Sequence, residues 1–458
     1  MKKAIIYVVL VLSVGLLSSV LGLNNAQVAS LTIFSGLICG TLLFWSFRLM
    51  FAFLGMAALI ALGLIDIPHI IEFAGLDVIL FLIGMMIVIG YLEERHFFEH
   101  LVNSVLDLVG NRPQLIIALL LVFSALFSAL VDEVTSILFM TTTMLHICSR
   151  LRLRAAPYIM MLVFATNVGS AATVVGNPIG VIIALRGGLS FGDFIRVATP
   201  ISCLCLVVTI VLCLWYFRRE VKELGEAKAV ADKECECAPQ EEAATAGNSP
   251  LVPWLLFLGT ITSLIMHAKM EQWLHLMKNS MLIGTSLAAG GVVMLLERER
   301  AKELVERRVD WWTLSFFIML FASVGTLKLV GTTTVIAKGL LNITGGNPVT
   351  IFLGITWATG ALTSILDNVL AVATFIPVIT DLKSLGMETT SCWWGMLFGG
   401  TLLGNMTIIG STANIVAIGM LERRGLGAIT MKEWILPGAL ISIPTCILAT
   451  FLLWWQFF

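Results

Sequence analysis

Charged residues are scarce in this sequence of 458 residues. Only 12% of them are Asp, Glu, Lys or Arg, whereas 58% are hydrophobic. Soluble domains are about 25% charged and about 45–50% apolar, so the apolar excess indicates surface that faces lipid. The formal net charge of −1 implies neither nucleic acid nor an acidic partner. The absence of strand-like alternation excludes a transmembrane β-barrel.

Three other signatures are missing. No G-x-x-x-x-G-K-[ST] phosphate-binding loop is present, so the chain itself is not expected to hydrolyse ATP. The nine cysteines are scattered, mostly singly within apolar stretches, which indicates small buried side chains rather than a disulfide framework. No A-x-A-like cleavage site follows Leu21, so the first apolar stretch is predicted to be a retained helix and not a signal peptide.

Long apolar runs recur along the whole chain, and each can cross about 30 Å of hydrocarbon as a helix. We predict an all-α membrane protein with about eleven crossings, at residues 4–22, 28–46, 49–66, 75–93, 156–186, 194–217, 251–268, 277–296, 311–330, 393–422 and 433–457. Two further apolar stretches, 114–148 and 347–383, carry polar residues near their middles and are predicted to be re-entrant hairpins. Arginine is concentrated in alternate loops, which places the N-terminus in the cytoplasm and the C-terminus outside, in a bacterial inner membrane.

The two halves of the chain resemble one another. Asp77 matches Asp310, Asp132 matches Asp367, and Thr173 matches Thr407, at separations of 233, 235 and 234 residues. We predict an extra N-terminal transmembrane helix at 1–27, a first inverted repeat at 28–217, a flexible cytoplasmic linker at 218–250 and a second inverted repeat at 251–458. Each half holds an odd number of crossings and one hairpin, so the second half is inverted, which favours a binding site near the bilayer midplane.

Two acids lie next to one another at the tip of the first predicted hairpin, Asp132 and Glu133, whereas the second tip carries Asp367 and Asn368. An ionised Asp at the centre of a membrane helix costs roughly 2.5–3.5 kcal/mol, so such residues face cavities, pair or take up protons. Adjacent carboxylates also repel, which favours a proton on one of them. Either aspartate can instead serve only as the N-cap of the second hairpin arm. The functional interpretation assigns proton or cation coupling to Asp132, Glu133 and Asp367.

Each hairpin is followed by a helix with Gly, Asn, Ser and Thr in its middle. Carbonyls freed at a break bind cations, and half-helix N-termini attract anions. Small residues also serve ordinary packing between membrane helices, but two such stretches at matching positions favour binding sites. The helix-breaking residues are Gly176, Pro178, Gly180, Gly404 and Gly410. The residues expected to line the solute and ion sites are Ser128, Thr135, Asn167, Thr173, Asn177, Ser364, Asn368, Asn405, Thr407, Ser411, Thr412 and Asn414.

Six ordered motifs carry a family resemblance. They are GYLEERHFFEHL (90–101), SALVDEVTSILFM (128–140), ATNVGSAATVVGNPIGVIIA (165–184), GLSFGDFI (188–195), SILDNVLAVATFIPVI (364–379) and GNMTIIGSTANIVAIGMLERRG (404–425). The chain resembles the ion transporter superfamily, and within it the branch of bacterial arsenite permeases and the melanosomal P protein, related to D-type sodium/proton antiporters and divalent anion/sodium symporters. The resemblance implies a transport subdomain, with two hairpins and two broken helices, that moves as an elevator along a scaffold subdomain, often in a homodimer.

The sequence departs from this branch at two places. The branch usually has Asp-Asn at both hairpin tips, but Glu133 stands where Asn is usual at the first tip. The first broken helix usually reads Gly-Asp-Pro-Pro-Asn, but residues 176–180 read Gly-Asn-Pro-Ile-Gly. Compared with the branch, this sequence has one acid fewer in the broken helix and one acid more at the hairpin tip. This difference leaves cation/proton exchange open as an alternative to arsenite-type transport.

We therefore predict a secondary active transporter, not an enzyme, that moves a small ion or solute, such as arsenite or another anion, by alternating access. The coupling ion is H+ or Na+, with Na+ at the hairpin tips, no structural metal and no other cofactor. The expected partners are the lipid bilayer and a second copy of the chain. A separate ATPase subunit, as in some arsenite permeases, stays open, and the alternative function is sodium/proton antiport.

A function of another class is weighed on His96, Glu99 and His100, which match the H-x-x-E-H pattern of certain zinc peptidases. The motif directly follows a predicted membrane span, and no convincing third ligand follows it. A membrane-bound metallohydrolase is therefore the less favoured alternative. Cys235 and Cys237 in the linker form a second, weaker candidate for a soft metal ion.

Overall fold

The computed structural model describes residues 2–95, 112–235, 251–424 and 427–458, which form helices and turns with no strand among them. The first half contains α1 (Lys2–Val20), α2 (Asn25–Leu43), η1 (Trp45–Phe47), α3 (Arg48–Ala61), α4 (Ile67–Phe73), α5 (Leu76–Glu94), α7 (Pro113–Leu130), α8 (Glu133–Leu151), α9 (Ala156–Ser170), α10 (Pro178–Gly187), α11 (Phe191–Asp193), η2 (Phe194–Ala198), α12 (Thr199–Tyr216) and α13 (Arg218–Cys235). The second half contains α14 (Leu251–Leu274), α15 (Ser280–Leu296), α16 (Ala301–Arg308), α17 (Trp311–Leu329), α18 (Thr332–Thr344), α19 (Pro348–Thr363), α20 (Asn368–Ser384), α21 (Thr390–Leu402), η3 (Leu403–Met406), α22 (Thr412–Arg423) and α23 (Met431–Phe457).

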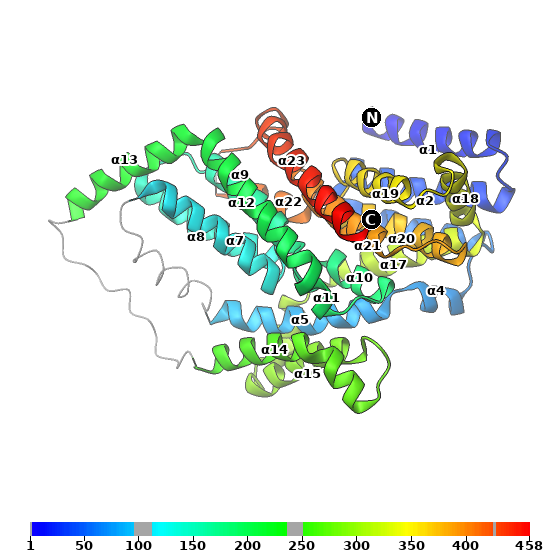
Figure 1. Ribbon diagram of the computed structural model, residues 1–458, viewed down its shortest axis with the longest axis horizontal. Helices are drawn as coiled ribbons and strands as arrows, with labels where there is room; N and C mark the ends of the chain where they lie inside the picture. Colours follow the sequence, from blue (N-terminus) through cyan, green and yellow to red (C-terminus); the bar gives the residue numbers. More distant parts are fainter. Residues whose placement is uncertain (1, 96–111, 236–250, 425–426) are drawn as a thin grey trace.

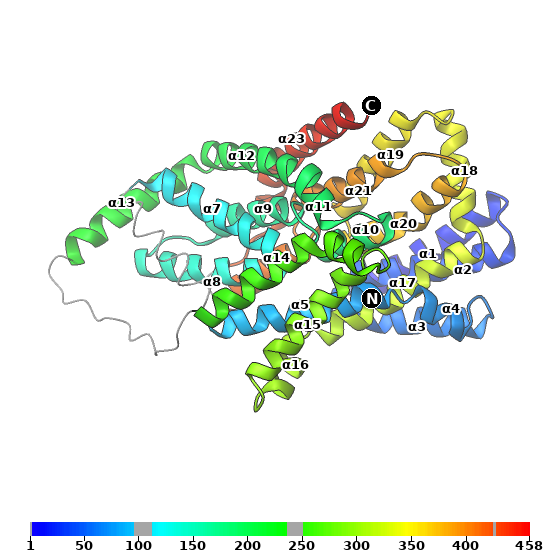
Figure 2. The same cartoon turned by 60° about the horizontal axis from the view of Figure 1, so that its bottom comes forward.

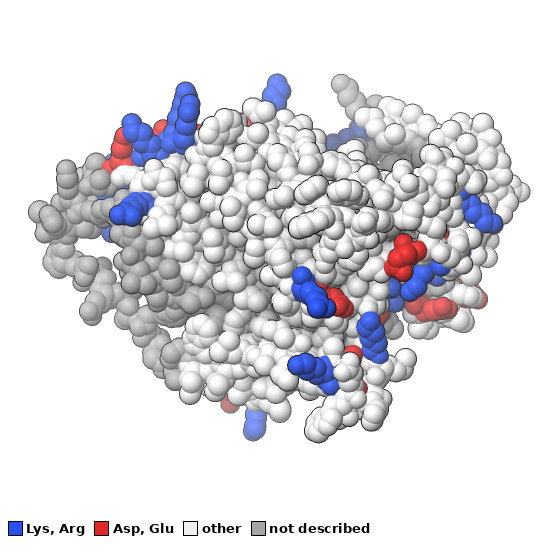
Figure 3. Space-filling view, in the orientation of Figure 1, with Lys and Arg blue, Asp and Glu red and all other residues white. Residues whose placement is uncertain are grey.

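Nine helical segments within the described residues are long and apolar enough to cross a membrane, which confirms the predicted all-α membrane protein. They are α1, α2, α5, α7, α8, the continuous segment 191–216, α14, α17 and α23. Most of the surface in Figure 3 carries neither basic nor acidic side chains, as a lipid-facing surface requires. These nine segments do not establish how many times the chain crosses the membrane, so the count of eleven crossings stays a prediction. Both arms of the first hairpin, α7 and α8, are among the nine segments, so its re-entrant path stays a prediction.

The two interruptions predicted inside apolar stretches are present as breaks between helices. The first lies between α7 and α8 at residues 131–132, and the second between α19 and α20 at residues 364–367. The stretches predicted as single spans at 156–186 and 393–422 are each split, into α9 and α10 and into α21 and α22. Local chemistry explains the first split, because Pro178 occupies the first turn of α10 and the Asn177 side chain accepts a hydrogen bond from the Gly180 backbone N–H.

The order of helices recurs along the chain. The first residues of α8 and α20 are 133 and 368, which differ by 235, and those of α10 and α22 are 178 and 412, which differ by 234. Asp77 and Asp310 are displaced relative to this pattern. Asp77 lies in the first turn of α5, whereas Asp310 is the N-cap of α17 and accepts a hydrogen bond from the Thr313 N–H. Asp310 therefore caps its helix, whereas Asp77 lies within the first turn of the matching helix.

The broken helices form the centre of the molecule. Every residue of α9 is buried, and α21 is buried from Ser391 to Leu402. α9 packs against α7, α8 and α12, while α21 packs against α19, α20 and α23. In Figure 1, α14 and α15 lie on the opposite side of α5 from α7 and α8, and Figure 2 shows α16 projecting beyond the end of α15. The hairpin tips thus meet the breaks deep inside the helical assembly.

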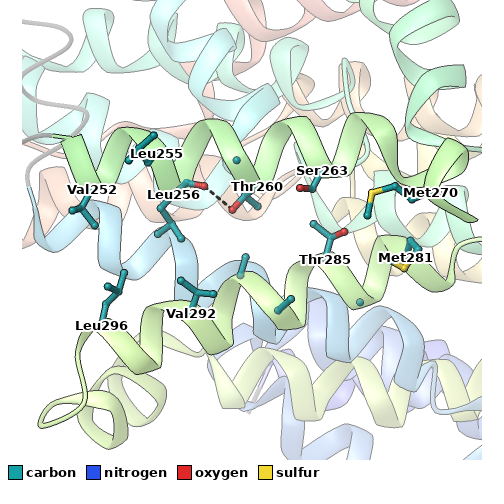
Figure 4. A pocket seen from close by; sticks show the side chains of 14 residues that line it. Val252, Leu255, Leu256, Thr260, Ser263, Met270, Met281, Thr285, Val292 and Leu296 are labelled. Atoms are coloured by element: carbon teal, nitrogen blue, oxygen red, sulfur yellow. Dashed lines mark hydrogen bonds between the residues drawn. The ribbon is translucent and has the colours of Figure 1, made fainter. Parts of the chain in front are cut away.

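Two features lie away from this centre. Between α14 and α15 runs an apolar groove of about 490 Å³ lined by small and apolar side chains (Figure 4). After α12 the chain continues into α13, which is helical from Arg218 to Cys235. The first 18 residues of the linker predicted at 218–250 thus form a helix, because they are rich in good helix formers such as Ala, Glu and Lys. That this segment is a cytoplasmic linker stays a prediction.

Candidate functional site

The first hairpin tip is stabilised by its own aspartate. Asp132 is the N-cap of α8, and its Oδ1 accepts hydrogen bonds from the backbone N–H groups of Val134 at 2.7 Å and Thr135 at 3.2 Å. The capping role weighed for Asp132 from the sequence is therefore observed. Asp132 and Thr135 are half-buried, whereas Glu133, which lies between them in the sequence, is 1% exposed.

The second tip uses its aspartate differently. Asp367 precedes α20 but makes no side-chain capping bond. Its Oδ1 instead accepts a hydrogen bond from the Thr412 hydroxyl, at 2.8 Å, on the first turn of α22. The second tip is thus connected to the second broken helix by a carboxylate that is 5% exposed.

The two hairpin tips touch one another through Glu133 and Asn368. Asn368 Nδ2 donates to Glu133 Oε1 at 3.1 Å and lies 3.4 Å from Oε2. Both side chains are 1% exposed. The charges of Asp132 and Asp367 also act on Glu133. Three carboxyl groups and one amide therefore lie near one another, and Glu133, the residue that departs from the usual pattern, makes a bond between the two halves.

Each broken helix is attached to its hairpin by a threonine. The Thr173 hydroxyl donates to the carbonyl oxygen of Ala129 near the end of α7. The Thr407 hydroxyl donates to the carbonyl oxygen of Ser364 at 2.6 Å, just after α19. These two bonds occupy matching places in the two halves, and both bind the loop of a broken helix to the first arm of a hairpin.

A cluster of amides joins the two broken helices. Asn167 Nδ2 donates to Asn405 Oδ1 at 2.7 Å and to Asn414 Oδ1 at 2.8 Å, and the Ser411 hydroxyl donates to Asn167 Oδ1 at 3.1 Å. Asn414 in turn donates to the carbonyls of Gly404 and Thr407, both at 2.8 Å. All four amide and hydroxyl side chains in this cluster are at most 1% exposed. Because each is engaged within the protein, this cluster holds the breaks in register.

Close backbone contacts explain two of the glycines. A Cβ at Gly176 would lie 2.3 Å from the carbonyl oxygen of Ser170, and one at Gly410 would lie 2.5 Å from that of Gly404. In both halves the loop of the break therefore folds back onto the end of the preceding half-helix. Only glycine allows this approach, since real Cβ atoms do not come within 3.0 Å of another heavy atom.

Two buried hydroxyls near the tips have no hydrogen-bond partner among the described residues. They are Ser128 Oγ on α7 and Thr363 Oγ1 on α19, at positions that differ by 235. Both side chains are 0% exposed. An unpaired buried hydroxyl costs free energy unless a bound water or ion completes it. The two positions match between the halves, so the first arm of each hairpin leaves one hydroxyl without a partner near its end.

Sequence reasoning missed three residues of this region. Thr363 could have been found from the repeat, because it stands 235 residues after Ser128; the neighbouring Ser364 was selected instead, and its hydroxyl donates to the carbonyls of Gly360 and Leu403. Ser170 accepts a bond from Asn177 Nδ2 at 2.8 Å. Arg48, at the start of α3, places its charge within electrostatic range of Asp367, and no sequence motif signals this contact.

A charged cavity of about 830 Å³ opens on one side of the tips. It is lined by Glu93, Glu94, Leu138, Phe139, Thr142, Arg300, Glu303, Arg307, Arg308 and Met420. Leu138 to Thr142 follow Glu133 by five to nine residues on α8, which is about 7–14 Å along a helix. The cavity therefore reaches from the surface to within two or three helical turns of the tip.

Most of the candidate residues predicted from the sequence lie within the part of the chain that the structure describes, and a few lie outside it. The hairpin tips, the threonines of the breaks and the asparagine cluster lie in one connected region, and their roles in transport stay a prediction. No group of three or more His, Cys, Asp or Glu side chains among the described residues is arranged to hold a metal ion. The motif of His96, Glu99 and His100, and Cys237, lie outside the described residues, so the metallohydrolase alternative stays a prediction.

An all-helical membrane fold with polar groups gathered at breaks in its buried helices is the arrangement of a membrane transporter. Comparison with known proteins is more specific. The chain belongs to the citrate transporter family, whose model matches residues 41–399 and 336–458.

Relatives of the chain support this assignment. An uncharacterized transporter of Mycobacterium tuberculosis is 32% identical over 420 residues, which cover 90% of this chain and 94% of that protein. The 46 kDa membrane protein of Mycobacterium leprae is 30% identical over 394 residues, 83% of this chain and 86% of the other. The human P protein is 26% identical over 472 residues, 87% of this chain but only 56% of the P protein. The predicted kinship with the P protein, within the ion transporter superfamily, is confirmed.

Proposed function

We propose that this protein is a secondary active transporter in which protons or Na+ drive the movement of a small anion by alternating access. The observation that carries the proposal is the bond between Glu133 and Asn368, which joins the two hairpin tips. A carboxyl group at this point can be neutralised by a proton or a cation. Neutralisation changes its bond to Asn368, so ion binding and the relation between the two halves are linked.

The charge of the region supports a coupled mechanism. Asp132, Glu133 and Asp367 lie close enough for their charges to interact. Ionised carboxyl groups inside a membrane protein are costly unless they pair with cations or take up protons. An anion would add further negative charge. We infer that a proton or Na+ binds first and that the anion follows, which is the order that coupled transport needs.

Two Na+ sites are proposed beside the tips. Na+ prefers oxygen ligands, and the unpaired hydroxyls of Ser128 and Thr363 are candidates for such ligands. Each lies in a hairpin arm to which a threonine of the neighbouring break is bonded, at Ala129 and Ser364 respectively. Carbonyl oxygens at an interrupted helix are the usual companions of such hydroxyls in cation sites.

The choice of anion rests on the description of the family to which the chain belongs. The family is described as citrate transporters, so citrate is the first solute to test, and arsenite is the second because of the resemblance to arsenite permeases. The cavity beside α8 and α22 provides the route for the solute. We further propose that this cavity faces the cytoplasm and that the protein resides in a bacterial inner membrane as a homodimer.

The proposal is tested with purified protein in liposomes that contain a pH-sensitive dye. Gradients of Na+, K+, citrate and arsenite are imposed in turn, and the internal pH is followed. We expect a proton flux that depends on citrate or arsenite and falls at least tenfold in Glu133→Gln. This variant keeps an acceptor for Asn368 but cannot ionise.

The control is Glu306→Gln on α16, an exposed residue paired with Lys302 at 3.7 Å, which should transport like the wild type. Proton flux driven by Na+ or K+ without any anion would instead support sodium/proton antiport, which the additional acid at the first tip also favours. Wild-type rates in Glu133→Gln would contradict both mechanisms.

A further inference from the structure

The end of α10 is attached to α5 by an ion pair. Arg186 Nη2 lies 2.9 Å from Asp77 Oδ1, and the two side chains are 38% and 32% exposed. Asp77 is in the first turn of α5, where a negative charge is favourable. Arg186 is in the last turn of α10, where a positive charge is favourable. The pair therefore joins the second part of the first broken helix to the start of a helix from outside the hairpin region.

A second contact holds the same end of α10. Asn279, which directly precedes α15, donates from Nδ2 to the carbonyl oxygen of Ala184 on α10 at 3.3 Å. Asn279 is 6% exposed. α5 and α15 pack against one another along their lengths. The end of α10 is thus bound both to α5 and to the residue that precedes α15.

The matching end of the second broken helix is different. Met420 on α22 stands 234 residues after Arg186, the same separation as between the starts of α10 and α22. α10 packs against α20 and α21, and α22 packs in the same way against α8 and α9. However, α10 also packs against α5, whereas Met420 lines the charged cavity that separates α22 and α8 from α5 and α16.

The ion pairs that the described residues form around that cavity lie on one of its walls. Arg308 pairs with Glu93 at 2.9 Å and Glu94 at 3.0 Å, and Arg300 pairs with Glu94 at 3.2 Å. These bonds connect α5 with α16 and the turn before it, all on one wall. The opposite wall contributes Leu138, Phe139, Thr142 and Met420. One end of the transport region is therefore held by polar bonds and the other borders a cavity.

From this difference we infer that the Asp77–Arg186 pair is a latch that holds one access path closed while the cavity side is open. The inference rests on the proposed alternating access and adds to it the residues that set the conformational balance. Opening the latch frees α10 from α5 and allows α8 and α22 to approach α16, which closes the cavity. Partly exposed ion pairs are weak, so removing this one should shift the balance about two- to fivefold and leave the protein folded.

The test is amide hydrogen exchange, followed by mass spectrometry on the full chain in lipid nanodiscs. Asp77→Asn and Arg186→Gln should each speed exchange about two- to fivefold in residues 184–190 and slow it in residues 138–145 beside the cavity. The charge-reversed double variant Asp77→Arg with Arg186→Asp should exchange more slowly at 184–190 than either single variant. Lys302→Gln, which removes an exposed ion pair within α16, should match the wild type.

The reciprocal change is what separates a latch from a structural ion pair. Faster exchange on both sides, or no change at 184–190 in either single variant, would overturn the latch. If the wild type transports none of the tested ions and yet the reciprocal shift occurs, the latch stands and the proposed function fails. If the wild type transports and no shift occurs, only the latch fails.

Discussion

The two hairpin tips occupy matching places in the chain but are built differently. At the first tip, Asp132 caps α8 with two backbone bonds, and residues 170–177 of the neighbouring break are buried throughout. At the second tip, Asp367 makes no capping bond and contacts Thr412 on the broken helix instead, and residues 406–409 are half-buried. The loop of the first break is thus more deeply buried than that of the second, whereas the tips show the reverse order, since Asp132 is half-buried and Asp367 is buried.

This difference shows that two tips at matching places in a repeated fold can have different roles. Hydrogen bonds within the first tip fix the position of Glu133, whereas the second tip offers Asn368 as its partner from a less constrained backbone. We infer that the first tip supplies the coupling charge and the second tip responds to it. The predictions below test that division, beginning with the largest expected effect.

The first prediction exchanges the two residues that touch. In the double variant Glu133→Asn with Asn368→Glu, one carboxylate and one amide remain in contact across the tips. We expect proton-coupled flux in liposomes to fall more than tenfold, because the carboxylate then stands beside Asp367, whose oxygen is bonded to Thr412, and not beside a capped Asp132. A rate within twofold of the wild type would show that the tips are interchangeable.

The second prediction concerns the folded-back loops. Gly176→Ala and Gly410→Ala each place a methyl group against a backbone carbonyl, and overpacking of this kind costs about 1–3 kcal/mol of stability. We expect the larger loss of thermal stability in detergent for Gly176→Ala, because its surroundings are buried on all sides. Gly419→Ala is the control, since a Cβ there meets nothing within 4 Å. Equal losses in all three variants would remove the distinction between the breaks.

The third prediction separates capping from coupling. Asp132→Ala should lower the free energy of unfolding by about 1 kcal/mol, because α8 loses its N-cap, while Asp132→Asn should retain it. Asp367→Ala should change stability less and reduce transport more, since it breaks one bond, from the half-buried Thr412 hydroxyl, whereas Asp132→Ala breaks two bonds from backbone N–H groups. Thermal unfolding and flux are measured on the same preparations. If Asp367→Ala is less stable than Asp132→Ala, the assignment of capping to Asp132 and coupling to Asp367 is contradicted.

The smallest effects are expected from the unpaired hydroxyls. Ser128→Ala and Thr363→Val remove groups that have no partner among the described residues, so stability should change little. If these hydroxyls bind Na+, the Na+ concentration for half-maximal transport should rise severalfold in each variant. Thr359→Val is the matched control, because its unpaired hydroxyl lies one helical turn before Thr363 on α19. Unchanged Na+ dependence in both site variants would exclude these sites.

The sequence predicted the residues of the candidate site better than it predicted where the surrounding helices end. The hairpin tips were found because charged and amide residues interrupt long apolar runs, and the breaks were found because glycine and proline do the same. The continuation of α12 into α13 was missed, because an acidic polar segment outside the membrane can be a helix or a loop. The partners of each polar residue were also missed, since spacing in one segment says nothing about which other segment lies beside it.

What the sequence determined by itself is the class of protein and the identity of its polar core. Its apolar excess requires a lipid-facing fold, and in such a fold a buried acid or amide is retained only where it has a function or a partner. The tertiary structure alone decided that Glu133 bonds to Asn368 and that Arg186 reaches Asp77. Both contacts join segments more than 100 residues apart, and the helices that carry these residues are positioned by packing over their whole lengths.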